Sequence, residues 1–229
     1  MAHDANSALI PQPPIPEEAR DFSRRVHGLM DGLAKDDATV AQVLDGMDNM
    51  LDLIAAGLYT MASMLVGEGE EGVRLVETSI ANTEISACSD PVEGRKSSRR
   101  ALSIAALEVL ARRDPGLLAV PRDAAPASPC IGDDDLDAAG MSHEDLEQAL
   151  AGPDRDRVRH WLEKLSPAAR TVFVLRAVAG MTAAETAKLL VEHGGPQAAG
   201  WTADSVRGVF RQGLCSLASQ LLQATTPGH

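Results

Sequence analysis

The 229-residue sequence has very few aromatic side chains. Phe, Trp and Tyr make up only 3% of the residues, whereas hydrophobic residues as a whole make up 45%. Such a core must be built mainly from Ala, Leu and Val, which favours helices, because strands are enriched in aromatic and β-branched residues. An alternating apolar pattern is also lacking. The sequence therefore predicts an all-α protein.

Features of membrane, secreted and metal-binding proteins are also lacking. The sequence has no apolar run of about 18 residues and no signal-peptide pattern at its start. The three cysteines, Cys88, Cys130 and Cys215, are odd in number and far apart, so neither a disulfide framework nor a zinc site is expected. The histidines show no metal-ligand spacing. We expect a cytoplasmic protein with no membrane contact, no metal and no cofactor.

Signatures of catalysis are missing as well. We find no Gly-rich phosphate-binding loop, no Ser-His-Asp order and no carboxylate pair in a recognisable setting. We therefore expect no enzymatic activity and assign no catalytic residue.

The net charge of −12 is distributed unevenly. Residues 153–229 hold nine basic and six acidic side chains, whereas residues 1–114 hold 11 basic and 19 acidic ones. Residues 115–152 hold one basic and eight acidic ones. The first two regions would repel a polyanion such as DNA, and only the last would tolerate it.

Four regions follow from the patterns along the chain. Residues 1–15 are interrupted by prolines and are expected to be disordered. Residues 16–114 show helical periodicity and predict a bundle, with a first helix after Pro16 that contains Phe22 and further helices at about 38–66, 70–86 and 93–113. The next region, 115–152, contains four prolines and an acidic run, and its composition predicts a linker. The acidic run is interpreted as a solvated tether, with nucleic-acid mimicry or cation binding as alternatives.

The last region, 153–226, contains two helix starts. Thr182 stands three residues before Glu185, the spacing of a capping box, and Thr202 caps the final helix. Trp201 and Val206 occupy the two positions of a hydrophobic staple. A glycine before the first start would end the preceding helix. This order of a helix, a glycine turn, a short capped helix and a longer capped helix predicts a helix-turn-helix.

The final helix has an apolar stripe, and its remaining face is the candidate DNA-binding surface. Arg207 and Arg211 are one turn apart, and each could contact a phosphate or a guanine edge. The alternative is a solvated face in which Asp204 offsets Arg207. The hydroxyls near the helix start suit phosphate. The candidate DNA-binding residues are Thr202, Asp204, Ser205, Arg207, Gly208, Arg211 and Gln212.

The block LEKLSPAARTVFVLRAVAGMTAAETAKLL, followed by SVRGVFRQGLCSLASQL, resembles the helix-turn-helix with which bacterial sigma factors bind the −35 element. The likeness is to the extracytoplasmic-function group, in which a Val-Phe-x-Leu-Arg block, a Gly and a helix with Glu-x-Ala precede the recognition helix. The resemblance implies a transcription initiation factor that binds RNA polymerase core and duplex promoter DNA. It also implies an anti-sigma protein as a further partner.

Upstream, LYTMASMLVGEGEEGVRLVETSIANTEI resembles the polymerase-binding domain of the same family. On that likeness, Glu71, Arg74 and Glu77 are the expected polymerase-binding residues. A basic cluster follows at the start of the next helix, where the helix dipole disfavours cations. It either faces DNA or is neutralised by neighbouring carboxylates. The cluster consists of Arg95, Lys96, Arg99 and Arg100.

The sequence departs from the family in two places. The connection VEHGGPQAAGW is longer than the family's tight turn, and Val209 and Gln212 stand where the family often has Arg. Promoter melting needs aromatic platforms for extruded bases, and the first region offers only Phe22 and Tyr59. Two alternatives therefore stay open: a regulator with a sigma fold and no promoter opening, and an acidic protein that mimics a sigma factor.

Overall fold

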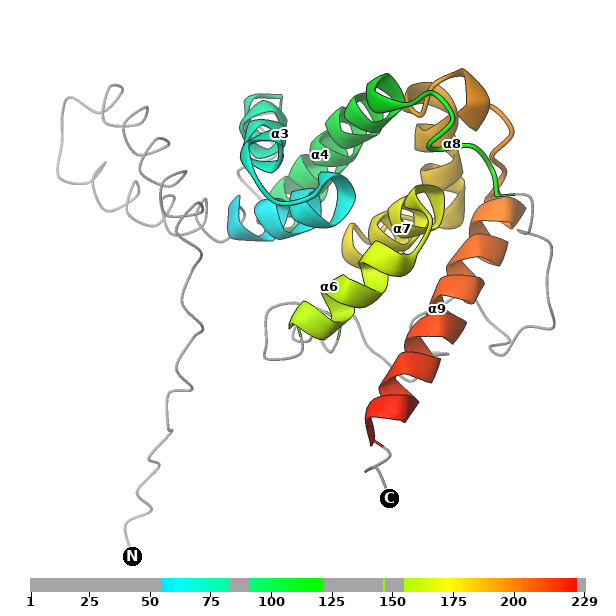
Figure 1. The fold of residues 1–229 in the computed structure, drawn as a ribbon. Helices are drawn as coiled ribbons and strands as arrows, with labels where there is room; N and C mark the ends of the chain where they lie inside the picture. Colours follow the sequence, from blue (N-terminus) through cyan, green and yellow to red (C-terminus); the bar gives the residue numbers. More distant parts are fainter. Residues whose placement is uncertain (1–54, 83–90, 122–145, 147–154, 226–229) are drawn as a thin grey trace, which may run out of the picture.

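The computed structural model describes residues 55–82, 91–121, 146 and 155–225, and no strand occurs among them. These residues are almost entirely helical, which confirms the predicted fold class (Figure 1). The predicted disordered start, the predicted helix that contains Phe22, the part of the predicted helix at 38–66 before residue 55, and the acidic run at 133–135 lie outside the described residues.

The first part of the described chain is a set of packed helices. A helix over residues 55–66 is followed by α3 (Glu70–Ala81) and α4 (Pro91–Arg113). The turn before α3 contains two glycines with positive φ, Gly67 at 94° and Gly69 at 119°, a conformation that L residues rarely adopt. The helices bury aliphatic side chains against one another, as the low aromatic content predicted. Among them are Leu58, Met61, Leu65, Leu75, Val76, Leu102, Leu107 and Leu110.

The second part of the described chain contains α6 (Arg155–Lys164), α7 (Pro167–Phe173), η3 (Val174–Val178), α8 (Ala183–His193), η4 (Pro196–Ala198) and α9 (Ala203–Thr225). Its core is centred on three aromatic rings. Trp161 of α6 meets Phe173 of α7 edge-on with centroids 4.9 Å apart, and Phe173 lies 5.6 Å from Phe210 of α9. Three of the five aromatic side chains among the described residues therefore meet where α6, α7 and α9 pack together.

A π-helix, η3, continues α7 and was not predicted. The N–H of Ala179 donates to the carbonyl of Val174 at 2.9 Å, a wider turn than an α-helix makes. Arg176 fixes the end of this turn, because its Nη1 donates to the Met181 carbonyl at 2.7 Å and its guanidinium lies over the Phe210 ring. Gly180 then ends the helix with φ of 72°, as predicted from the glycine before the capping box.

The two regions that were predicted as separate domains share one hydrophobic core within the described residues. Helix α4 packs on α8, and polar contacts join the two parts at several points. Arg99 donates to the Val178 carbonyl at 2.9 Å, and Glu68 pairs with Arg159. Together these contacts show that α4 is a direct neighbour of α8 and of the turn before it.

The start of the predicted linker is part of this core. Leu118 is fully buried, and its carbonyl accepts a 2.7 Å hydrogen bond from the indole N–H of Trp201. Leu146 is also buried. The first residues of the predicted linker, 115–121, are therefore packed, because the prolines of this stretch flank the apolar segment Leu-Leu-Ala-Val. Residues 122–145 and 147–154 lie outside the described residues.

One prediction about cysteine was wrong. Cys215 of α9 is disulfide-bonded, whereas the odd number and wide spacing of the cysteines had predicted no disulfide. The other two cysteines, Cys88 and Cys130, lie outside the described residues. No helix in the described part is long and apolar enough to cross a membrane. No group of three or more potential metal ligands is found there either.

Candidate nucleic-acid interface

Helices α8 and α9 each begin with a reciprocal cap. The hydroxyl of Thr182 accepts from the N–H of Glu185 at 3.2 Å, and a Glu185 carboxylate oxygen accepts from the N–H of Thr182 at 2.8 Å. This confirms the predicted capping box. The cap of α9 has the same form, with Ser205 in place of the glutamate. The N–H of Ser205 donates to Thr202 Oγ1 at 3.1 Å, and the Ser205 hydroxyl accepts from the N–H of Thr202 at 2.9 Å.

This second cap changes the assignment of Ser205. Its hydroxyl also donates to the Thr202 carbonyl at 2.9 Å, so its hydrogen-bonding capacity is largely used within the first turn of α9. Ser205 therefore fixes where α9 begins. Thr202 is exposed, although its Oγ1 takes part in the cap.

The first cap also affects the ionisation of Glu185. Hydrogen bonds from the backbone N–H and the hydroxyl of Thr182 lower the pKa of this carboxyl below its ordinary value. Lys96 and Arg100 of α4 lower the pKa further by their positive charge. The start of α8 therefore lies within electrostatic reach of the basic cluster on α4.

The long connection between α8 and α9 is a packed structural element. Gly194 must be glycine, because a Cβ there would lie 2.5 Å from the Leu190 carbonyl oxygen and 2.7 Å from Ala198 Cβ. Gly195 has φ of 83°, and Ala198 is fully buried. The residues that lengthen this connection place Trp201 against the segment at residues 117–118. Trp201 is buried there.

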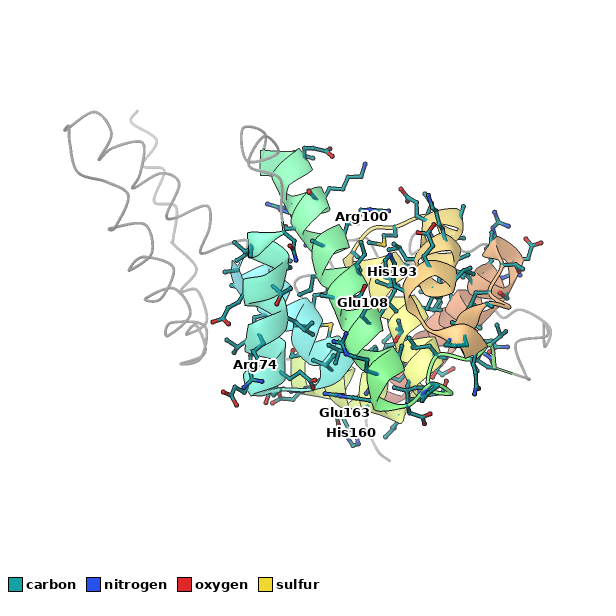
Figure 2. All side chains as sticks on the ribbon, turned by 90° about the horizontal axis from the view of Figure 1, so that it is seen from above. Arg74, Arg100, Glu108, His160, Glu163 and His193 are labelled. Carbon is teal, nitrogen blue, oxygen red and sulfur yellow. The ribbon has the colours of Figure 1, made fainter. Side chains whose placement is uncertain are left out.

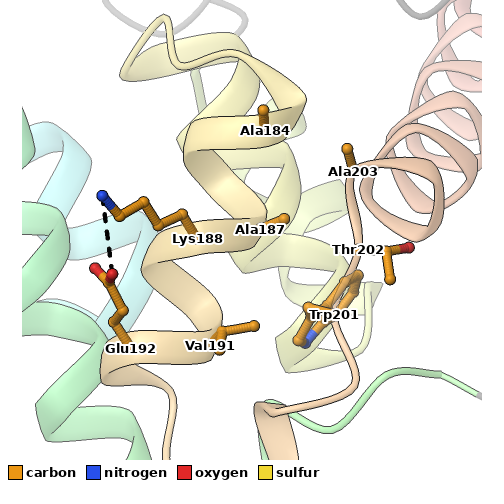
Figure 3. A pocket seen from close by; sticks show the side chains of 8 residues that line it. All are labelled: Ala184, Ala187, Lys188, Val191, Glu192, Trp201, Thr202 and Ala203. Carbon is orange, nitrogen blue, oxygen red and sulfur yellow. Dashed lines mark ion pairs between the residues drawn. The ribbon is translucent and has the colours of Figure 1, made fainter.

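A shallow hollow of about 350 Å³ lies between α8 and the start of α9 (Figure 3). Its walls are mainly apolar and its one cation is Lys188, whose Nζ lies 3.9 Å from Glu192 Oε1. Lys188 is not among the DNA-binding candidates proposed from the sequence. The helical period could have indicated it, because two residues on from Lys188 the buried Leu190 lies on the opposite side of α8. The hollow is lined by Ala184, Ala187, Lys188, Val191, Glu192, Trp201, Thr202 and Ala203.

The candidate contact residues of α9 lie on its outer face. Arg207 Nη1 is 2.6 Å from Asp204 Oδ1, and the two side chains are 45% and 92% exposed. Arg211 is half-buried and forms no ion pair with the described residues. Gly208 is half-buried and Gln212 is exposed. The Arg207–Asp204 pair matches the predicted alternative, but such an exposed pair contributes only about 0–1 kcal/mol, so a phosphate can replace the carboxylate easily.

The candidate polymerase-binding residues lie on α3. Glu71 is half-exposed and pairs with Arg113 of α4, which also donates to the Val66 carbonyl at 3.2 Å. Arg74 is exposed and lies 3.3 Å from Glu70. Glu77 is half-buried. Glu71 is therefore part of the contact between α3 and α4, and Arg74 is the most accessible of the three.

The basic cluster of α4 divides into two sets. Arg99 is directed towards the second part of the chain, where it donates to the Val178 carbonyl. Arg95, Lys96 and Arg100 are exposed, and the last two lie near Glu185 of α8. No family model, curated protein or solved structure matches this chain.

Proposed function

We propose that the protein is a DNA-binding transcription initiation factor of the sigma type, which recognises promoter DNA through α9 and recruits RNA polymerase. The observation that carries this proposal is the two-sided character of α9. One side is buried against α7 and α8 through Val206, Val209, Phe210, Leu214 and Leu217. The other side carries Arg207, which is exposed, and Arg211, which is half-buried. Helix α8 packs against both α9 and α4 (Figure 1).

The dimensions of α9 suit the major groove of DNA. An α-helix with side chains is about 10–12 Å wide, and the groove is about 12 Å wide. Arg207 and Arg211 are one turn apart, so their side chains would reach neighbouring base pairs or the flanking phosphates. The caps of both helices leave their outer first turns exposed, where backbone N–H groups attract phosphate.

The polymerase part of the proposal is supported by the sequence resemblance and by the accessible face of α3. Arg74 and Glu70 are both exposed there and pair with each other at 3.3 Å. In this proposal the chain makes and breaks no covalent bond. It positions polymerase on DNA.

One observation favours a narrower function. Tyr59 is the only aromatic residue among the described residues of the first part, and its ring is packed over Gly72, where a Cβ would lie 3.6 Å from Tyr59 Cε2. A ring held there offers no platform for an extruded base. A helix-turn-helix regulator that binds duplex DNA without opening it is therefore the second candidate.

Two measurements test these functions. Purified protein should bind a fluorescent duplex with an affinity that falls steeply as salt rises, because phosphate contacts release counterions. It should also be retained on immobilised RNA polymerase core. DNA binding without polymerase binding would leave the regulator as the better assignment. Polymerase binding without salt-dependent DNA binding would overturn the assignment of α9 and favour an acidic mimic of a sigma factor.

A further inference from the structure

Helices α4 and α8 lie side by side and run in the same direction. Near their C-terminal ends, Glu108 Oε1 of α4 lies 3.2 Å from His193 Nδ1 of α8 (Figure 2). Eight residues earlier on each helix stand Arg100 and Glu185. Because every residue of an α-helix advances about 1.5 Å, these two positions have the same register, about 12 Å from the first pair.

The register agrees with the other contacts between the two helices. Beyond the C-terminal end of α8, a Cβ on Gly195 would lie 3.2 Å from Ala111 Cβ of α4. Before the start of α8, Arg99 donates to the Val178 carbonyl. The whole of α8 is therefore flanked by α4, and Lys96 and Arg100 stand beside its N-terminal end.

Helix α8 consequently has α4 on one side and the start of α9 on the other. The hollow lined by Lys188 and Thr202 lies on the α9 side, and α4 lies across α8 from it (Figure 3). The Lys and Arg side chains of these three helices are Arg95, Lys96, Arg99, Arg100, Arg112 and Arg113 of α4, Lys188 of α8, and Arg207 and Arg211 of α9. Their carboxylates are Glu93, Glu108, Glu185, Glu192 and Asp204.

We propose that α4 is a second DNA-contacting element, and that Lys96 and Arg100 contact phosphates of the same duplex whose major groove receives α9. The proposal rests on the proposed DNA-binding function and adds a contact that the helix-turn-helix alone does not contain. The net positive charge of these three helices indicates a polyanion as the partner: they hold nine Lys and Arg side chains and five carboxylates, in a chain whose net charge is −12. This excess of positive charge suits a phosphate backbone.

The distances are compatible with one duplex. Packed helices lie about 8–10 Å apart, so α4 is about one helix diameter from α8. With α9 in a groove about 12 Å wide, the backbone that borders the groove on the α8 side comes within reach of long side chains on α4. The first part of the chain would then bind DNA together with the helix-turn-helix as one body.

The test is a salt titration of duplex binding with three double variants of the full-length chain. Lys96→Ala with Arg100→Ala removes the α4 contacts, and Arg207→Ala with Arg211→Ala removes those of α9. Arg157→Ala with Lys164→Ala removes the same charge from exposed positions on α6 and is the matched control. Unchanged melting temperatures would show that all three variants are folded.

Each lost phosphate contact reduces the slope of log affinity against log salt by about 0.9. For the α4 variant we expect a slope smaller by about two, so the affinity lost between 50 and 200 mM salt would be roughly tenfold less than in the unaltered protein. The charge-conserving pair Lys96→Arg with Arg100→Lys should restore the slope, because either cation binds phosphate.

The outcomes separate this inference from the proposed function. If the α9 variant loses affinity and the α4 variant behaves like the control, α9 binds DNA and the inference about α4 is wrong. If only the α4 variant loses affinity, the α4 contact stands and the assignment of α9 falls. If the unaltered protein shows no salt-dependent duplex binding, both are overturned.

Discussion

The indole N–H of Trp201 donates a 2.7 Å hydrogen bond to the buried carbonyl of Leu118. Trp201 immediately precedes the cap of α9, and Leu118 belongs to the segment that follows α4. A single side chain thus joins the start of the proposed recognition helix to the first part of the chain. The orientation of α9 and the position of α4 are therefore mechanically linked.

The first prediction concerns this bond. Trp201→Phe keeps most of the apolar surface but leaves the Leu118 carbonyl without its donor, which costs about 1–3 kcal/mol in the free energy of unfolding. Urea denaturation followed by circular dichroism measures the loss. Trp161→Phe is the control, because Trp161 donates to the hydroxyl of Ser216, which can rotate to another partner. Equal losses in the two variants would contradict a special role for the Leu118 bond.

The second prediction concerns the capping box of α8. Thr182→Ala should lower the free energy of unfolding by about 1 kcal/mol, because the N–H of Glu185 loses its acceptor. Ala184→Ser is a control at an exposed position of the same turn. If Thr182→Ala is no less stable than that control in urea denaturation, the cap contributes nothing to stability.

The third prediction concerns pH. Because the pKa of Glu185 is lowered in the folded protein, the stability it adds is fully present above its ordinary unfolded pKa of about 4.3. That contribution disappears as pH falls through the lower, folded pKa. The difference in unfolding free energy between the unaltered protein and Glu185→Gln should therefore shrink below about pH 4. If this difference in unfolding free energy instead grew on acidification, folding would raise the pKa of Glu185 and not lower it.

The fourth prediction compares two glycines. A Cβ on Gly213 would lie 3.1 Å from the Phe173 ring at the aromatic centre, so Gly213→Ala should destabilise by about 1–3 kcal/mol through overpacking. A Cβ on Gly57 would meet nothing within 4 Å, and this residue is helical. Gly57→Ala should therefore stabilise by about 0.5–1 kcal/mol. Thermal melts of both variants measure this contrast. Shifts of the melting temperature in the same direction and of similar size would refute it.

The fifth prediction concerns the Arg207–Asp204 pair. Asp204→Asn removes a carboxylate that would face phosphate and that lies 2.6 Å from the Arg207 guanidinium. Binding to a duplex of arbitrary sequence should become several-fold tighter at low salt, and the gain should fade as salt screens the charges. Fluorescence anisotropy gives both affinities. Weaker binding by Asp204→Asn would show instead that the carboxylate itself contacts DNA.

The sequence alone was sufficient for the local elements of the site. The capping box at Thr182, the cap at Thr202 and the terminating Gly180 are all present. Each depends on residues within four positions of one another, so the pattern contains all the information. The buried stripe of α9 was predicted for the same reason, because helical period alone determines which side chains share a face.

Only the tertiary structure decided how these elements meet. No local pattern places Leu118 against Trp201, or sets Arg100 and Glu185 in the same register, because those residues are far apart in the chain and approach one another only through packing. The role of Ser205 as a cap and the π-helix at Val174–Val178 depend on hydrogen bonds that do not alter the apolar pattern. Helix ends and faces follow from local backbone chemistry, whereas the combined surface of α4, α8 and α9 follows from the burial of one shared core.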